Sequence, residues 1–192
     1  ARITADSWGG PIANRCIKES CAGSSALHLV AAGNSGWNND WLPSFPANYN
    51  LPNLISVAAT DHNDGLAEFS QYGKRNVDLG APGVDILSTI PGGGYDTYSG
   101  TSMATPHVAG AAGLIASANP EISNEELRAR LLGGVDQVPS LDGKTVTGGR
   151  LNVNNSLTMD APPVQEGGPG GGSIWDEIVE RIGEEIGEKV GQ

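Results

Sequence analysis

The sequence predicts an α/β domain, in which strands and helices pack around one core. Residues 27–32 and 54–60 form short apolar runs, and the second is rich in β-branched residues, as expected of buried strands. Small and apolar residues dominate from 104 to 116, which predicts a helix surrounded by protein. The 28 glycines and the 5% of aromatic residues suit a domain with many loops and close backbone contacts.

Length and charge limit what the protein can be. A chain of 192 residues is long enough for one domain with a real core. The formal net charge of −11 argues against nucleic acid and against anionic membrane surfaces as partners. No apolar run reaches the length of a membrane span, and no signal peptide opens the chain. Because Ala1 leads directly into a predicted strand, we expect a processed chain or a fragment.

The two cysteines, Cys16 and Cys21, are five residues apart. They could close a small disulfide loop in an oxidising compartment, or they could be reduced thiols on a helix. Their spacing, with no cluster of histidines nearby, makes a zinc site an unfavoured interpretation.

The other elements follow from local patterns. We predict a strand at 1–8 ending in Gly9 and Gly10, then a helix at 11–26 with Pro11 near its start. Further along we predict a loop at 37–53, strands at 77–79 and 84–88, a glycine-rich hairpin-like loop at 90–99, a surface helix at 122–132 and a last strand at 149–153.

The surface helix has the clearest start signal. Ser123 is its expected N-cap, Glu126 stands three residues later as in a capping box, and Ile122 and Leu127 are placed for a hydrophobic staple. Gly133 and Gly134 are expected to stop it.

The chain is predicted to divide near residue 160. Residues 1–160 would form the folded domain, and residues 161–173, rich in glycine and proline, a flexible linker. Residues 174–192 would form an acidic amphipathic helix, because Ile174, Ile178, Ile182 and Ile186 recur at helical spacing.

Residues 100–110, with the sequence GTSMATPHVAG, carry the strongest chemical signal. Ser102 is expected in the first turn of the apolar helix, near unpaired N–H groups and the positive end of the helix dipole. A nucleophile that generates an oxyanion suits such a position. Pro106 is also expected in the first turn, where a missing N–H costs little. Taken alone, however, a Gly-Thr-Ser sequence is better explained as the cap of an ordinary core helix.

Three segments together resemble the subtilisin-like serine proteases, the subtilases. GTSMATPHVAG resembles their nucleophile segment, HLVAAGNSG at 28–36 their oxyanion-hole segment, and SWGG at 7–10 their substrate-binding strand, in the order of that family. The resemblance runs from residue 1 to about 157. It implies a three-layer fold with a mainly parallel sheet, of which this chain would be the carboxyl-terminal part.

The resemblance also implies roles for individual residues. Ser102 would be the nucleophile of a serine endopeptidase acting on polypeptides, and the Asn34 side chain and the Ser102 N–H would hold the oxyanion. Asn34 alone would be better explained as a turn asparagine before glycine. The substrate would pair as an added strand, and the residues bordering its pocket would be Ser7, Trp8, Gly9, Ala31, Ala32, Gly33 and Thr101. Trp8 is bulkier than the aliphatic residue expected there.

A cation site is implied by two further segments. FPANY at 45–49 resembles a family loop whose X-Pro bond is often cis and whose main-chain oxygens, here those of Ala47 and Tyr49, can hold a cation. Asp61 resembles a ligand of the same site, and calcium would suit such oxygen ligands. Scattered loop acids are more often simply solvated. No cofactor is expected for the chemistry itself.

The family's aspartate and histidine segments, D-x-G and H-G-T-x-V-A-G in form, are absent and belong upstream of Ser7. Of the three histidines, His107 is ~140° round the helix from Ser102. His28 is ~20 Å from Asn34 along a strand, and His62 is interpreted as a loop residue. We therefore expect the amino-terminal part of the same peptidase, or a partner, to supply both residues, and this chain to be nearly inactive alone.

Two other functions stay open from the sequence. The chain could belong to a non-catalytic, subtilase-derived peptide-binding module, or to a peptide cyclase or acyl transferase that uses the same nucleophile. Because the family is mostly secreted, an extracellular location is expected for the parent protein.

Overall fold

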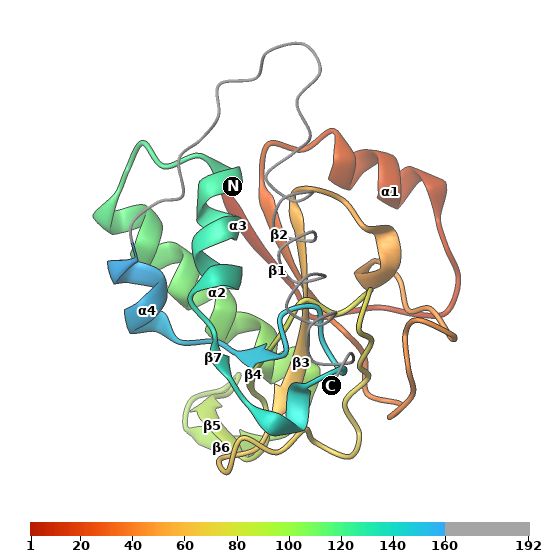
Figure 1. Ribbon diagram of the computed structural model, residues 1–192. Coiled ribbons are helices and arrows are strands. Elements are labelled where there is room, and N and C mark those ends of the chain that lie inside the picture. Colours follow the sequence, from red (N-terminus) through yellow and green to blue (C-terminus); the bar gives the residue numbers. More distant parts are fainter. Residues whose placement is uncertain (160–192) are drawn as a thin grey trace, which may run out of the picture. The chain divides into compact units, whose positions relative to one another are not determined.

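A six-stranded sheet lies at the centre of residues 1–159, the part of the chain that this computed structural model describes (Figure 1). The strand order is β1-β2-β3-β4-β8-β7, and all neighbours are parallel except β7 and β8. The strands are β1 Ile3–Asp6, β2 Leu27–Ala31, β3 Leu54–Thr60, β4 Leu79–Pro82, β7 Asp136–Gln137 and β8 Gly149–Arg150. The predicted α/β fold with a mainly parallel sheet is confirmed.

Helices cover both faces of this sheet. The long helix α2, Thr101–Ala118, packs across β1 to β4, and α3, Asn124–Gly133, and α4, Val153–Thr158, pack against α2. The helix α1, Arg15–Ala22, and the short 3-10 helix η1, Ala47–Tyr49, lie on the other side (Figure 1). Every residue of β2 and β3 is buried, as expected of parallel strands covered on both faces.

The register of the sheet shows which strands end together at one edge. Asp6, the last residue of β1, pairs with Val30, the residue before the end of β2, so these two strands end side by side, whereas β3 continues beyond them to Thr60. The segments that follow β1 and β2 therefore leave the sheet at the same edge, where open α/β sheets usually bind ligands.

The helix α2 is apolar all round but is buried on one side only. Ala104, Val108, Ala111 and Ile115 are buried against the sheet, whereas Leu114 is 56% exposed. The prediction that protein surrounds this helix is therefore wrong for residues 1–159, because within this range the sheet, α3 and α4 leave its other side uncovered.

Pro106 lies in the second turn of α2, not in the first as predicted. The helix begins at Thr101, so Pro106 is its sixth residue, and Gly100 stands at the N-cap position. An N–H at this position would donate to the carbonyl of Ser102, four residues earlier. Because proline has no N–H, the Ser102 carbonyl has no partner within the helix.

Several predicted boundaries are corrected. The first strand is shorter than 1–8, and the helix predicted at 11–26 begins only after Asn14, whose side chain caps it by accepting from the Ile17 N–H. The strands predicted at 77–79 and 84–88 lie two residues further along, at β4 and at β5, Ile86–Thr89. In the range predicted as a strand at 149–153, only Gly149 and Arg150 belong to a strand, and α4 begins at Val153.

A separate hairpin joins β5 to β6, Tyr95–Tyr98. The turn carries Gly92, Gly93 and Gly94, all with positive φ, which glycine adopts without a steric penalty. All but one of the strand residues are exposed, and the hairpin lies at the foot of Figure 1.

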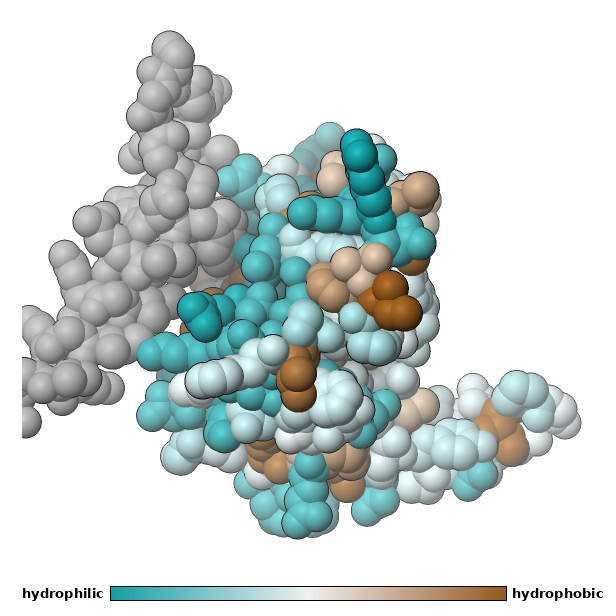
Figure 2. All heavy atoms as spheres, turned by 90° about the vertical axis from the view of Figure 1, so that its right-hand side faces the viewer, coloured by the Kyte–Doolittle hydropathy of each residue, from teal (hydrophilic) through white to brown (hydrophobic). Residues whose placement is uncertain are grey.

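The face drawn in Figure 2 carries scattered apolar residues among polar ones, with a narrow arm extending from the lower part of the body.

Both cysteines are free thiols on α1, so the disulfide interpretation is wrong for this structure. Residues five apart on a helix lie ~140° round its axis from each other, which points their side chains in different directions.

The surface helix starts as predicted, since the Ser123 hydroxyl accepts from the Glu126 N–H at 3.0 Å and both Ile122 and Leu127 are buried. The Glu126 carboxylate pairs with Arg130 instead of closing the capping box. No helix within residues 1–159 is long and apolar enough to cross a membrane. The predicted linker and amphipathic tail lie outside the described residues.

A buried ion pair ties α3 to the sheet and predicts a stability effect. Arg128 donates to the Asp78 carboxylate at 3.0 Å and to the Leu54 carbonyl at 3.2 Å. Arg128→Met should leave a buried carboxylate without its cation and cost about 3–5 kcal/mol. The free energy of unfolding of the natural protein, from denaturant titration, measures this loss.

Arg15→Met is the matched control, because Arg15 forms an exposed pair with Glu19 one turn away. It should cost about 0.5 kcal/mol or less. Equal losses in the two variants would contradict the structural role of the Asp78–Arg128 pair.

Candidate active site

A cavity of about 310 Å³ opens where β1, β2 and α2 meet. The segment after β1, the turn after β2 and the first turn of α2 all border it. Its lining residues are Ser7, Trp8, Gly9, Gly10, Pro11, Ala31, Gly33, Asn34, Ser35, Trp37, Pro43, Ser44, Gln71, Thr101 and Ser102. None of these side chains is charged, so the cavity is polar through hydroxyl and amide groups alone.

Ser102 stands in the first turn of α2, as predicted. Its hydroxyl donates to the Ser7 carbonyl at 3.3 Å, and the Ser7 hydroxyl donates to the Ser102 carbonyl at 2.9 Å. No hydrogen-bond acceptor for the Ser102 N–H is found among residues 1–159. This N–H is one of the unpaired donors that every helix presents at its start.

The side chain of Asn34 is held in one orientation by the residue before Ser102. Its Oδ1 accepts from the Thr101 N–H at 2.9 Å and from the Thr101 hydroxyl at 2.9 Å. The same hydroxyl accepts from the Gly33 N–H at 3.2 Å. Because the carbonyl end of the amide is engaged, its NH₂ end is the part left to donate.

Two nitrogen donors that have no acceptor among residues 1–159 lie close to Gly100. A methyl group built on Gly100 would lie 3.6 Å from Asn34 Nδ2 and 3.7 Å from the Ser102 nitrogen. Both nitrogen atoms therefore lie beside the same small volume next to Gly100, at the start of the helix that carries Ser102.

Comparison with known proteins settles the family. The model of the subtilase family matches residues 1–156. The chain is 46% identical over 125 residues to alkaline elastase YaB from Bacillus sp. (strain YaB), and 41% identical over 160 residues to thermitase from Thermoactinomyces vulgaris. This chain belongs to the subtilase family.

The chain spans only part of these relatives. The match with alkaline elastase YaB covers 65% of this chain and 31% of that protein, and the match with thermitase covers 82% and 54%. A solved structure of proteases from Pseudoalteromonas arctica PAMC 21717 has the same fold, with a TM-score of 0.73 at 28% identity. This match covers 82% of this chain and 50% of that one.

Most of the residues predicted to border the substrate pocket of this subtilase do lie at the cavity. Ser7, Trp8, Gly9, Ala31, Gly33 and Thr101 line it. Ala32 does not, because it is fully buried beneath the turn. Trp8 is half exposed, so its ring forms part of the rim.

Gln71, which no sequence motif singles out, supports the turn that contains Gly33. Its N–H donates to the Gly33 carbonyl at 2.9 Å, and its side chain donates to Asn39 Oδ1 at 2.6 Å. The Gly33 φ of +116° needs glycine, and a Cβ there would also collide with the Gln71 amide. Gly33 and Gln71 are 38 positions apart, so no local sequence pattern indicates this contact.

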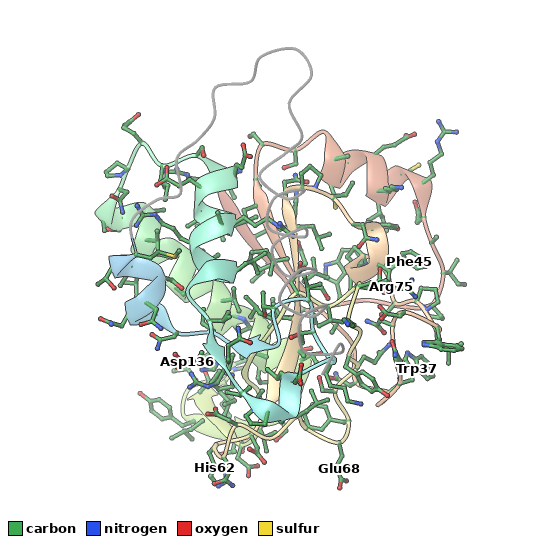
Figure 3. All side chains as sticks on the ribbon, in the orientation of Figure 1. Trp37, Phe45, His62, Glu68, Arg75 and Asp136 are labelled. Carbon is green, nitrogen blue, oxygen red and sulfur yellow. The ribbon has the colours of Figure 1, made fainter. Side chains whose placement is uncertain are left out.

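No histidine of the chain contacts Ser102. His107 approaches the Met103 carbonyl at 2.9 Å on its own helix. His28 lies with Thr4 and Asp6 on the sheet. His62 is exposed, and Figure 3 places it at the lower end of the molecule, well apart from Trp37 of the cavity.

The structure does not bring the three predicted calcium ligands together. Ala47 and Tyr49 pack against Leu54 at the start of β3, whereas Asp61 follows its other end, roughly 20 Å along the strand. Asp61 Oδ1 accepts from the N–H groups of Asn63 and Gly65, both at 2.8 Å. Asp61 therefore closes a turn. The Phe45–Pro46 bond is cis, in agreement with the loop that FPANY resembles.

These turn hydrogen bonds predict a pH effect. The N–H groups of Gly65 and Asn63 lower the pKa of the Asp61 carboxyl. A carboxylate with a lowered pKa stabilises the fold above its ordinary pKa of about 3.9, and this contribution is lost as the pH falls through the lowered value.

Carbon-13 NMR titration of the natural protein should give Asp61 a midpoint below that of aspartate in a model peptide. Calcium should leave the Asp61 resonance in place. A normal midpoint, or a calcium-dependent shift of this resonance, would contradict the assignment of Asp61 as a turn residue.

Proposed function

We propose that this chain is the nucleophile-bearing part of a serine endopeptidase that hydrolyses polypeptides through an acyl-enzyme on Ser102. The observation that carries the proposal is that Asn34 Nδ2 and the Ser102 nitrogen, neither with an acceptor among residues 1–159, lie beside the same small volume at Gly100, at the start of the helix that carries Ser102. Membership of the subtilase family supports it.

In this proposal the Ser102 hydroxyl attacks the substrate carbonyl carbon. Its proton passes to a histidine that lies outside this chain, and that histidine is oriented by an aspartate. The charge that develops on the carbonyl oxygen is held by Asn34 Nδ2 and the Ser102 N–H. Such donors are effective because they are already oriented before the charge appears. Water then releases the acyl group and restores Ser102.

Two exposed surfaces support the idea that the missing groups come from an upstream part of the peptidase or from a partner. The strand β1 has only β2 as a neighbour in the described sheet, so its other edge keeps unpaired backbone groups. The apolar helix α2 leaves Leu114 exposed on the side away from the sheet. A folded unit that covered both surfaces could carry the base.

The cavity favours an uncharged substrate side chain. It has no acidic or basic residue in its lining, and Trp8 and Trp37 provide apolar walls. Burying a charged side chain there would cost solvation without an ionic partner. We include secretion of the parent protein in the proposal, which fractionation of the source cells would test.

A non-catalytic peptide-binding module is the second candidate. The Ser102 hydroxyl contacts only the Ser7 carbonyl among the described residues, and a serine without a base is a poor nucleophile. A cyclase or acyl transferase would use the same groups. Mass spectrometry of the products from a linear peptide separates hydrolysis, which adds water, from cyclisation or transfer.

Asn34→Leu tests the proposed oxyanion site in the natural protein. The loss of one oriented donor should lower kcat about 10²- to 10³-fold, with little change in KM. Steady-state hydrolysis of a chromogenic peptide measures both constants. Asn63→Ala, in an exposed loop, is the control and should keep the parent kcat.

Thr101→Val should have a smaller effect in the same direction. It removes one of two hydrogen bonds to Asn34 Oδ1 and leaves the backbone bond in place. An Asn34→Leu variant with the parent kcat, or one that loses only affinity for substrate, would contradict the oxyanion role.

A further inference from the structure

The hydrogen bonding of α2 has a gap at Ser102. The carbonyl of Ser102 would normally accept from the N–H four residues later, and Pro106 has none. Neighbouring carbonyls of the first turn are satisfied: Thr101 accepts from the Thr105 hydroxyl at 2.8 Å, and Met103 is approached by His107 Nδ1 at 2.9 Å. The open acceptor therefore belongs to Ser102 itself.

Ser7 fills this gap from another part of the chain. Its hydroxyl donates to the Ser102 carbonyl at 2.9 Å across 95 residues of sequence, and its own carbonyl accepts from the Ser102 hydroxyl at 3.3 Å. The two serines thus exchange hydrogen bonds between the end of β1 and the start of α2. A backbone N–H at 106 would make the first of these bonds unnecessary.

We propose that Ser7 is a positioning residue for the nucleophile, acting through the hydrogen bond from its hydroxyl to the Ser102 carbonyl. The inference rests on the proposed function. The Ser7 segment is expected to form a wall of the substrate pocket. In addition, the Ser7 hydroxyl holds the first turn of α2, the helix that carries Ser102.

The geometry explains why such a bond matters. The first turn of α2 is held on one side by Asn34, which accepts from Thr101. Ser7 holds the same turn at the next residue, so the two contacts together set the direction of the Ser102 side chain. A nucleophile displaced by about 1 Å from its attack geometry can lose up to about 10² in rate. Ser7 is itself exposed, so its hydroxyl contributes little to the packing of the core.

The test is a double-mutant cycle in the natural protein, with kcat and KM measured on a peptide substrate. Ser7→Ala should lower kcat about tenfold with KM nearly unchanged, and Ser7→Thr, which keeps a hydroxyl, should retain the parent kcat. In the Pro106→Ala background, where the helix can supply its own N–H, the further change Ser7→Ala should cost about twofold or less. Ser117→Ala, on the exposed side of α2, is the control.

A direct contact between Ser7 and substrate would give the opposite pattern. Ser7→Ala would then cost the same with Pro106 or Ala at position 106, or would mainly raise KM, and either result would overturn the proposal.

A readout independent of activity separates this proposal from the proposed function. The carbonyl carbon-13 resonance of Ser102 should move upfield in Ser7→Ala, because the carbonyl loses its donor, and should return in the double variant with Pro106→Ala. An unchanged resonance in Ser7→Ala would overturn the inference even in a fully active enzyme. The predicted shift in a protein that cleaves no peptide would support the hydrogen bond and contradict the proposed function.

Discussion

The cavity depends on the two hydrogen bonds by which Thr101 holds the carbonyl oxygen of Asn34. They join the turn after β2 to the first turn of α2, and they decide which end of the Asn34 amide is free. Thr101 is fully buried, so water does not compete for these bonds. The positions of Gly33, Asn34 and Ser102 follow from this contact, because Gly33 also donates to the Thr101 hydroxyl.

In the proposed function, the described residues hold the nucleophile and the oxyanion donors but not the base. Ser102 exchanges hydrogen bonds with Ser7, and Asn34 Nδ2 and the Ser102 nitrogen lie beside the same volume at Gly100, yet none of the three histidines contacts Ser102. The open edge of β1 and the exposed side of α2 are consistent with this proposal, because other parts of a parallel α/β fold normally cover such surfaces. The proposed activity would therefore be a property of a larger assembly that includes this chain.

Strong local patterns were enough to predict much of the fold and of the site. The buried strand at 54–60, the cap at Ser123 and the place of Ser102 at the start of a helix all follow from short segments. Contacts between distant segments could not be predicted in this way. Ser7 and Gln71 meet partners that are far away in the sequence, and sequence motifs do not show that Asp61 lies at the far end of β3 from Tyr49.

The central claim is that Ser102 is a nucleophile whose base lies outside this chain. Covalent labelling with a fluorophosphonate, followed by peptide mapping, tests it most directly. The natural protein should be labelled rapidly at Ser102, and a polypeptide of residues 1–192 alone should be labelled slowly. Rapid labelling of that isolated polypeptide, or labelling of the natural protein at another residue, would contradict the claim.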